Sequence, residues 1–229
     1  MPMNSNQSDI RAWVLDVDDT VYLERDYVQS GFNAVGDFVE RIHGVSGYGA
    51  ICWSLFQSGV RGQVFDQASA VLGAVTNAIP VADLVGVYRS HRPTISCDET
   101  TIKVLKILKE TSELAIITGG PEEAQRQKVA ALGLSAICEK IVFAGARGSE
   151  FDKPHPWAWQ EIEEKTGFQG TDLIYVGDNP NKDFQAPLKL GWRTIRIRLK
   201  ESLHESLPTP PGVIEVHSVD EAVQIFSTA

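Results

Sequence analysis

Short apolar runs separated by amphipathic stretches recur along this chain. Six runs have the length and composition of buried strands: Trp13–Val17, Leu114–Thr118, Ile141–Phe143, Leu173–Val176, Thr194–Ile197 and Val213–Val216. Helical periodicity fills three of the intervals, at Thr101–Lys109, Glu122–Leu132 and Trp157–Lys165, and glycines follow the last two. Strands that alternate with helices in this way predict an α/β fold, with a Rossmann-like parallel sheet and helices on both faces.

The stretch after the first predicted strand breaks this alternation. It carries helical stripes and no convincing strand; the apolar positions are Phe32, Val35, Phe38, Val39 and Ile42, then Val64, Phe65, Ala68, Val71 and Leu72, then Val81, Leu84, Val85 and Tyr88. We therefore predict an all-helical domain at residues 24–93, inserted into a core domain made of residues 1–23 and 94–229. An insertion at this point is expected over the carboxyl ends of the strands, where a cap belongs. The alternative is that these helices simply pack on a face of the sheet.

Three carboxylates and a threonine follow the first predicted strand, in the segment Asp16-Val17-Asp18-Asp19-Thr20. Asp16 and Asp18 project to the same side if the chain stays extended there. Two neighbouring carboxylates repel each other, which separates their proton affinities and favours a bound cation. The segment can therefore supply a nucleophile, an acid/base and metal ligands. An ordinary acidic loop whose Asp19 and Thr20 cap a helix is the alternative.

Three later segments carry polar groups at a strand end or a helix start. Thr118-Gly119-Gly120 ends a strand and lets backbone N–H groups approach an anion, although it is also an ordinary turn. Lys153-Pro154 opens a helix, where a lysine is more often a solvated surface charge. Gly177-Asp178, with Asp183 shortly after, again places carboxylates after a buried strand, as a cation or a cap requires.

Composition excludes several classes of partner. A formal net charge of −9 argues against a nucleic-acid partner, which needs a basic face. The first eleven residues are polar, and the sequence contains neither an apolar signal segment nor a run long enough to span a membrane. Three widely spaced cysteines indicate reduced thiols. We expect a cytoplasmic protein, monomeric or homodimeric, with no membrane association.

The four motifs, at Asp16-Val17-Asp18-Asp19-Thr20, Thr118, Lys153 and Gly177-Asp178 with Asp183, resemble those of the haloacid dehalogenase-like (HAD) superfamily in order and context. The resemblance runs from about Ala12 to Arg198, and the helical insertion resembles a C1-type cap. It implies that Asp16 attacks phosphorus and forms an aspartyl-phosphate, and that Asp18 protonates the leaving group and then deprotonates water. We expect Asp16 to be ionised at neutral pH and the pKa of Asp18 to be raised by its anionic neighbours.

The same resemblance implies a Mg²⁺ cofactor and a set of binding residues. Thr118 and Lys153 would contact the phosphoryl group. The metal ligands would be the Asp16 carboxylate, the Asp18 backbone carbonyl and Asp178, with Asp183 orienting Asp178, Lys153 or a metal-bound water. The family often has Asn or Asp after the threonine of its second motif. Here Gly119 leaves only a backbone N–H for the substrate.

These features predict a phosphatase that acts on a small phosphomonoester, either a sugar phosphate or a nucleoside monophosphate. The presence of an aspartate at position 18 favours phosphoryl transfer over a 2-haloacid dehalogenase reaction. A phosphomutase and a non-catalytic binding protein of the same fold are also consistent with the motifs. A looser likeness to pyrimidine nucleotidases continues from Gly177–Asp183 through Phe184, Pro187 and Gly191-Trp192. In the insertion, Arg61 is a candidate substrate contact, although a solvated loop charge explains it equally well.

Overall fold

The computed structural model describes residues 10–227, which divide into two compact units. One unit runs to Glu24 and resumes at Ser96, and the other is Arg25–Ile95. Residues 1–9, most of the polar N-terminal segment, lie outside the described residues, so the predicted absence of a signal segment is not tested there. The role of the inserted unit as a cap stays a prediction.

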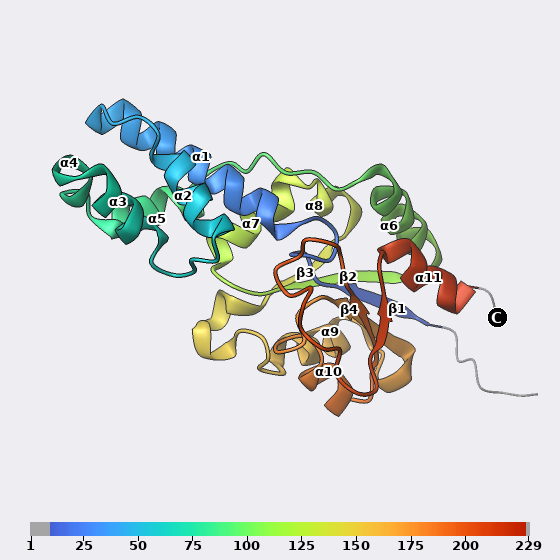
Figure 1. Ribbon diagram of the computed structural model, residues 1–229. Helices are drawn as coiled ribbons and strands as arrows, with labels where there is room; N and C mark the ends of the chain where they lie inside the picture. The colour runs from blue at the N-terminus through green and yellow to red at the C-terminus, as the bar shows by residue number, and fades with distance from the viewer. Residues whose placement is uncertain (1–9, 228–229) are drawn as a thin grey trace, which may run out of the picture. The chain divides into compact units, whose positions relative to one another are not determined.

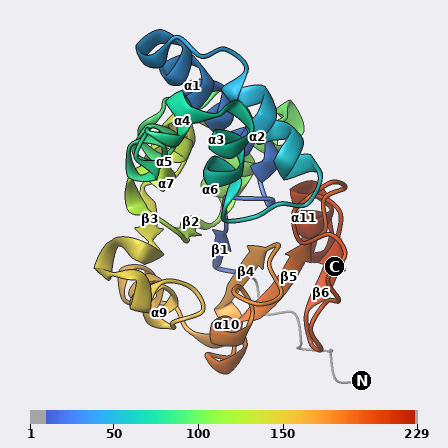
Figure 2. The ribbon, with the colours of Figure 1, turned by 60° about the vertical axis from the view of Figure 1, so that its left-hand side comes forward.

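The first unit is built on a six-stranded parallel sheet (Figures 1 and 2). Its strands are β1 Ala12–Leu15, β2 Glu113–Thr118, β3 Lys140–Phe143, β4 Leu173–Gly177, β5 Arg193–Ile197 and β6 Ile214–Val216. The spatial order is β3-β2-β1-β4-β5-β6, and β1 lies between β2 and β4 in parallel register with both. The sequence prediction of a Rossmann-like parallel sheet is confirmed.

Helices cover both faces of this sheet (Figure 1). On one face lie α6 Glu99–Thr111, α7 Glu122–Ala131, α8 Leu134–Ile137 and α11 Val219–Ser227, and on the other lie α9 Trp157–Thr166 and α10 Gln185–Lys189. The short 3-10 helices are η1 Ala144–Arg147, η2 Ser149–Phe151 and η3 Gly170–Asp172. Because both faces are covered, every residue of β1 is buried and the strand is uniformly apolar instead of alternating.

Local signals in the sequence set the ends of these helices. The Asp98 side chain caps α6 by accepting a 2.9 Å hydrogen bond from the Thr101 N–H. Gly133 and Gly167 have left-handed φ values of 69° and 72° at the ends predicted for them. Most side chains avoid this conformation, so glycine ends a helix there with little strain.

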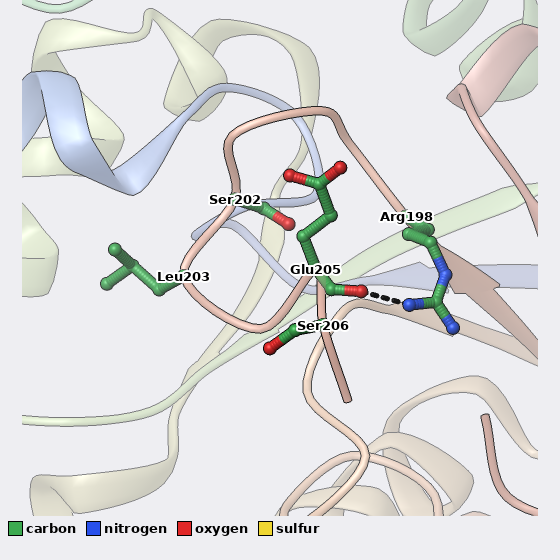
Figure 3. Close-up of a pocket in the computed structure, with 5 residues that line it drawn as sticks. All are labelled: Arg198, Ser202, Leu203, Glu205 and Ser206. Carbon is green, nitrogen blue, oxygen red and sulfur yellow. Dashed lines mark hydrogen bonds between the residues drawn. The ribbon is translucent and has the colours of Figure 1, made fainter. Parts of the chain in front are cut away.

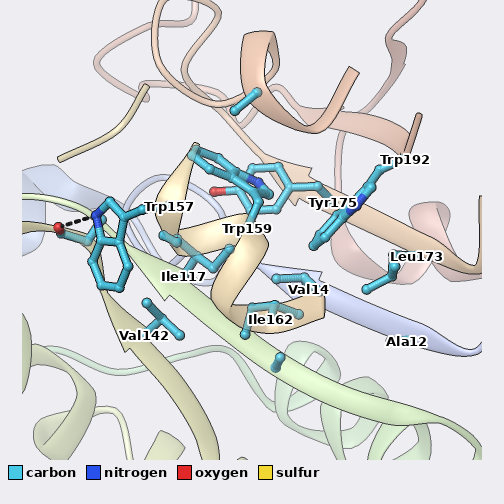
Figure 4. Packing of buried hydrophobic residues seen from close by; sticks show 14 residues of the cluster. Ala12, Val14, Ile117, Val142, Trp157, Trp159, Ile162, Leu173, Tyr175 and Trp192 are labelled. Carbon is cyan, nitrogen blue, oxygen red and sulfur yellow. Dashed lines mark hydrogen bonds between the residues drawn. The ribbon is translucent and has the colours of Figure 1, made fainter. Parts of the chain in front are cut away.

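The aromatic core lies between β1–β4 and helix α9 (Figure 4). Trp159 and Ile162 of α9 are fully buried there, and the Trp159 ring contacts Tyr175 edge-on at 5.3 Å between centroids. Trp157 also packs into this cluster and donates its indole N–H to the Ala144 carbonyl at 3.1 Å. Both tryptophans near Lys153 are therefore core residues, and they hold the start of α9 against the sheet.

The second unit consists of helices: α1 Glu24–His43, which begins at the boundary, α2 Tyr48–Gln57, α3 Val64–Leu72, α4 Ala74–Asn77 and α5 Val81–Ser90. Helices α1 and α2 approach closely at Gly36 and Gly49, since a Cβ built on Gly49 would lie 2.5 Å from the Phe32 carbonyl oxygen. Aromatic rings of Phe32, Phe65 and Tyr88 fill the centre of the unit.

Three positions of the predicted helical stripes do not face this core, and one of them, Val81 at the start of α5, is 37% exposed. Ile42 is 57% exposed and Val71 is 66% exposed, so the stripe prediction is wrong at all three. Ile42 and Val71 each lie in the last turn of their helix, and Ile42 is about 9 Å along the axis from the contact at Gly36. Periodicity continues to the end of a helix, whereas the packing partner ends sooner.

Two further expectations concern membrane spans and thiols. None of the helices within residues 10–227 is both long and apolar enough to cross a bilayer. Cys52, Cys97 and Cys138 are free thiols, and Cys52 and Cys138 are buried.

We expect Ile162→Ala to lower the free energy of unfolding by about 2–5 kcal/mol, because it opens a cavity in a fully buried site. Ile107→Ala on α6 removes the same atoms from a side chain that is 54% exposed and is the matched control. Its effect should stay within roughly 0.5 kcal/mol. Urea unfolding followed by circular dichroism measures both, and equal effects would contradict this account of the core.

Candidate active site

The predicted site residues of the first unit meet at the carboxyl edge of its sheet. Asp16 follows β1, Thr118 ends β2 and Asp178 follows β4, and these three strands are neighbours. The strand order reverses between β1 and β4, and at such a point the outgoing loops diverge and leave room for a ligand.

Lys153 connects the first and last motifs through two buried ion pairs. Its Nζ lies 2.8 Å from Asp16 Oδ1 and 2.7 Å from Asp183 Oδ1, and it also donates to the Tyr175 hydroxyl at 3.2 Å. The lysine is only 6% exposed, so the surface-charge interpretation of this residue does not hold. Burying an ammonium is costly without anionic partners, and here two carboxylates supply them.

Asp183 is fully buried and its carboxylate is occupied by protein donors. Oδ1 accepts hydrogen bonds from Lys153 and Tyr175, and Oδ2 accepts from the backbone N–H groups of Asp178 and Asn179 at 3.1 and 2.8 Å. Gly177 makes this approach possible, since a Cβ there would lie 2.7 Å from Asp183 Oδ2. Asp183 therefore holds the loop after β4 in shape.

Asp178 differs from Asp183 in a way that suits a cation. It is 4% exposed, yet its Oδ2 has no hydrogen-bond partner within residues 10–227. Carboxylate oxygens of Asp16, Asp178 and Asp183 lie within 4.8 Å of one another. An unpartnered buried oxygen beside a second carboxylate is the environment that a hard divalent cation stabilises. The residues present fit Mg²⁺.

The buried carboxylates have shifted pKa values. Burial raises the pKa of Asp16 to about 7, helped by the charges of Asp183 and Asp18 and opposed by Lys153. Burial and the charge of Asp183 also raise the pKa of Asp178 well above its usual value. The ordinary carboxyl pKa expected for Asp16 therefore does not apply to the protein alone, because burial outweighs its pairing with Lys153.

The expectation for Asp18 is also corrected. Burial alone would raise the pKa of Asp18, but the charge of Lys128, with hydrogen bonds from Lys128, Tyr22 and Gln125, lowers it below the usual value. The Lys128 Nζ lies 2.7 Å from both carboxylate oxygens. Anionic neighbours were visible in the sequence, whereas the cation comes from α7, 110 residues later.

The second motif is buried and crowded. Thr118 is 1% exposed and donates its hydroxyl to Gln125 Oε1 at 2.7 Å. A Cβ on Gly119 would lie 2.8 Å from Asp152 Oδ1 and 2.9 Å from Lys153 Cε. The Asp152 carboxylate occupies that space by accepting a 2.9 Å hydrogen bond from the Gly120 N–H. The family's usual Asn or Asp is absent here because its side chain would have no room.

Of the remaining members of the first motif, Asp19 has structural contacts, whereas the buried Thr20 Oγ1 has no hydrogen-bond partner within residues 10–227. Asp19 accepts hydrogen bonds from the Glu24 N–H at 2.9 Å, at the start of α1, and from the Leu203 N–H at 2.7 Å. Its backbone has a φ of 50°, which makes the turn after Asp18 tight. A helix-capping role for Asp19 is therefore compatible with catalytic roles for the neighbouring Asp16 and Asp18.

Arg61 belongs to the helical unit and has its contacts there. Its Nη1 donates to the carbonyls of Phe56 and Val60 at 2.7 and 2.9 Å, and its guanidinium lies 3.9 Å from the centre of the Phe56 ring. Its role as a substrate contact stays a prediction.

Sequence reasoning missed three buried polar residues around the site: Gln125 and Lys128 on α7, and Arg196 on β5. Arg196 is 1% exposed; its Nε donates to the Asp178 carbonyl at 2.9 Å and its Nη2 to the His204 carbonyl at 2.6 Å. The sequence contained a feature that could have identified each of these residues. Gln125 and Lys128 share one helix face three residues apart, and Arg196 interrupts an apolar strand.

The loop after β5 forms a hollow of about 510 Å³, lined by Arg198, Ser202, Leu203, Glu205 and Ser206 (Figure 3). Arg198 crosses it and donates to the Glu205 carbonyl. None of the predicted site residues lines this hollow. The same loop is nevertheless tied to the site by the hydrogen bond from the Leu203 N–H to Asp19.

The family model of haloacid dehalogenase-like hydrolases matches residues 10–191, and the chain belongs to this family. Among curated relatives, glyceraldehyde 3-phosphate phosphatase of Methanocaldococcus jannaschii is 26% identical over 161 residues, covering 70% of this chain and 69% of the relative. N-acylneuraminate-9-phosphatase of Rattus norvegicus is 28% identical over 97 residues, covering 42% of this chain and 38% of the relative.

Solved structures show the same fold. The HAD hydrolase YfnB of Bacillus subtilis has a TM-score of 0.64 at 17% identity, covering 96% of this chain and all of that one. A 2-haloacid dehalogenase of Pseudomonas syringae pv. Tomato DC3000 has a TM-score of 0.62 at 18% identity, covering 96% and 99%. At such identities the likeness establishes the fold alone. The prediction of a hydrolase of this superfamily is confirmed, and the phosphatase relatives support its assignment as a phosphatase.

We expect Gly119→Ala to lower the free energy of unfolding by about 1–3 kcal/mol, because the new methyl group conflicts with Asp152 and Lys153. Gly86→Ala within α5 meets nothing within 4 Å and should instead raise stability by roughly 0.5–1 kcal/mol. Thermal unfolding separates the two. A Gly119→Ala protein as stable as the unaltered chain would show that the space is available after all.

Proposed function

We propose that this chain is a Mg²⁺-dependent phosphatase that hydrolyses a small phosphomonoester through an aspartyl-phosphate on Asp16. The observation that carries the proposal is the buried pairing of Asp16 with Lys153 at 2.8 Å, beside an Asp178 carboxylate oxygen that has no hydrogen-bond partner within residues 10–227. This arrangement joins a nucleophile, a fixed cation and an oxygen suited to a metal at the switch point of the sheet.

The proposed reaction has two displacements at phosphorus. First, an Asp16 oxygen attacks, the bond from phosphorus to the ester oxygen breaks, and the protonated form of Asp18 transfers its proton to the leaving alkoxide. Because Lys128 lowers the pKa of Asp18, this form is the minor one in the protein alone and has to be formed before the first displacement. Second, a water attacks the aspartyl-phosphate, Asp18 takes its proton, and phosphate leaves with Asp16 restored. Lys153 contacts the phosphoryl oxygens and offsets the charge that develops on them. The Thr118 hydroxyl would donate to them only after it turns away from Gln125, which accepts its single hydrogen in the structure.

Mg²⁺ would be held by the Asp16 and Asp178 carboxylates and the Asp18 backbone carbonyl. Asp183 would not bind the ion but keeps the loop after β4 in place through its hydrogen bonds to the backbone. When bound, the ion supplies positive charge that offsets the buried carboxylates and the phosphate oxygens. YfnB, which has a similar fold, has been solved bound to magnesium.

Substrate class is proposed from the curated relatives and the fold. Both relatives named above are phosphatases of phosphorylated sugars, so we favour a sugar phosphate over a nucleoside monophosphate. Dehalogenases share the fold, but a second carboxylate at Asp18 serves a reaction that must protonate an alkoxide. A phosphomutase or a binding protein lacks a comparable specific observation in its favour.

We propose further that the helical unit caps the site and that Arg61 contributes to substrate selection. Cytoplasmic location and a monomeric or homodimeric state stay predictions.

Phosphate release from a panel of sugar phosphates and nucleoside monophosphates tests the proposal. We expect release that is abolished by EDTA and restored by Mg²⁺, with kcat/KM highest for a sugar phosphate. Ranking by kcat/KM decides between the two substrate classes. If the whole panel gives no metal-dependent release, the phosphatase assignment is wrong.

The nucleophile is tested by Asp16→Asn, which removes the attacking carboxylate at nearly constant volume. We expect kcat to fall on the order of 10³-fold or more, because no other group is placed to form the covalent intermediate. Asp172→Asn, before β4 at the opposite edge of the sheet, is the matched control and should leave kcat unchanged. Full activity in Asp16→Asn would contradict the mechanism even if the enzyme is a phosphatase.

A further inference from the structure

The Asp18 carboxylate is held by side chains from a distant helix. Lys128 Nζ lies 2.7 Å from both carboxylate oxygens, and Gln125 Nε2 donates to Oδ2 at 3.0 Å. The Tyr22 hydroxyl adds a hydrogen bond to Oδ1 from within the same loop. These donors approach from different directions, so they restrict rotation of the carboxylate about its χ angles.

Lys128 is buried in a way that surface lysines are not. The residue is 2% exposed, and besides Asp18 it has Glu24 at 3.8 Å. A lysine in the middle of a helix can usually extend its ammonium to water, and complete burial is rare unless an anion pairs with it. The ion pair with Asp18 is therefore part of the packed structure, not a surface contact of little consequence.

Gln125 joins Asp18 to the second motif. Its Oε1 accepts the Thr118 hydroxyl hydrogen at 2.7 Å, which leaves its Nε2 to donate to Asp18. Gln125 is 3% exposed, so this amide has fixed partners on both sides. A single side chain thus sets the position of Asp18 relative to Thr118, one a proton-transfer group and the other a contact to the phosphoryl group.

We propose that Lys128 and Gln125 are positioning residues for Asp18, holding its carboxylate in the direction from which it exchanges protons with the leaving group and with water. The inference rests on the proposed function, and it assigns two residues of α7 outside the four motifs to the proton-transfer half of the reaction. Both act through Asp18, Gln125 acts also through Thr118, and neither needs to contact the substrate.

Leaving-group dependence tests the proposal because a positioning role predicts a selective loss. An alkyl phosphate needs a proton on its leaving oxygen, whereas p-nitrophenyl phosphate expels a stable anion without one. We would measure kcat/KM for both substrates with Mg²⁺ present, in the unaltered chain, Lys128→Met and the control Lys103→Met. Lys103 has a side chain that is 73% exposed on α6, so the control removes a surface charge of the same type.

We expect Lys128→Met to lower kcat/KM for the alkyl phosphate by about 10–100-fold and for p-nitrophenyl phosphate by less than about threefold. Lys103→Met should change neither. Equal losses for the two substrates would overturn the inference, because a merely structural defect affects both alike. Failure of the unaltered chain to hydrolyse either substrate would instead overturn the proposed function and, with it, the inference.

Gln125→Leu keeps the test decisive if Lys128→Met does not fold, which circular dichroism reports. It leaves the ion pair intact but also removes the acceptor of the Thr118 hydroxyl, which affects both substrates. We therefore expect the loss in kcat/KM to be about three- to tenfold larger for the alkyl phosphate than for p-nitrophenyl phosphate. In an Asp18→Asn background, Gln125→Leu should cost no more activity on the alkyl phosphate than it costs on p-nitrophenyl phosphate, since residues that act through one group are not additive. A full additional loss in that background would overturn the role assigned to Gln125.

Discussion

The need to bury several carboxylates at one place governs this site. Asp16, Asp178 and Asp183 present oxygens within 4.8 Å of one another, and each residue is nearly or fully buried. Like charges at such distances repel strongly where water is excluded, so the cluster needs compensation. Lys153 supplies part of it by pairing with Asp16 and Asp183, and its own pKa is raised well above the usual value because these pairings outweigh burial. Within residues 10–227, Asp178 Oδ2 has no hydrogen-bond partner, and this uncompensated carboxylate suits a divalent cation.

Two glycines let the charged groups come this close. At Gly177 the missing side chain makes room for the Asp183 carboxylate, which in turn receives the backbone N–H groups of the loop after β4. At Gly119 the missing side chain makes room for Asp152 and for the end of Lys153. The glycine that departs from the family pattern thus lies where this chain has no room for a larger residue. The Asp152 carboxylate, hydrogen-bonded to the Gly120 N–H, occupies the space that a side chain at position 119 would need.

The sequence sufficed for the sheet and for the identity of the clustered residues, because apolar runs and strand-end motifs are local signals. Thr118 and Asp178 could be placed beside Asp16 since the carboxyl ends of parallel strands meet at one edge. Lys153 precedes helix α9 and does not end a strand, so only the resemblance to the family placed it in the site. The protonation of Asp16 and Asp18 could not be predicted, since it depends on burial and on Lys128, which lies 110 residues from Asp18. Ile42 and Val71 were misplaced because periodicity identifies a helix face but not how far its partner extends.

Arg196 shows that the site is not confined to the segment that defines the family. The matched segment ends at residue 191, yet the guanidinium of Arg196 holds the Asp178 carbonyl from one side and the carbonyls of His204 and Leu207 from the other. The last two strands and the loop between them thus determine the shape of the loop that carries Asp178. A chimaera joined at residue 191 would keep all four motifs. It would nevertheless replace Arg196, whose guanidinium hydrogen-bonds the backbone of the motif at Asp178. Divergence among relatives in this C-terminal segment is therefore a route by which the position of Asp178 can change without any substitution in a motif.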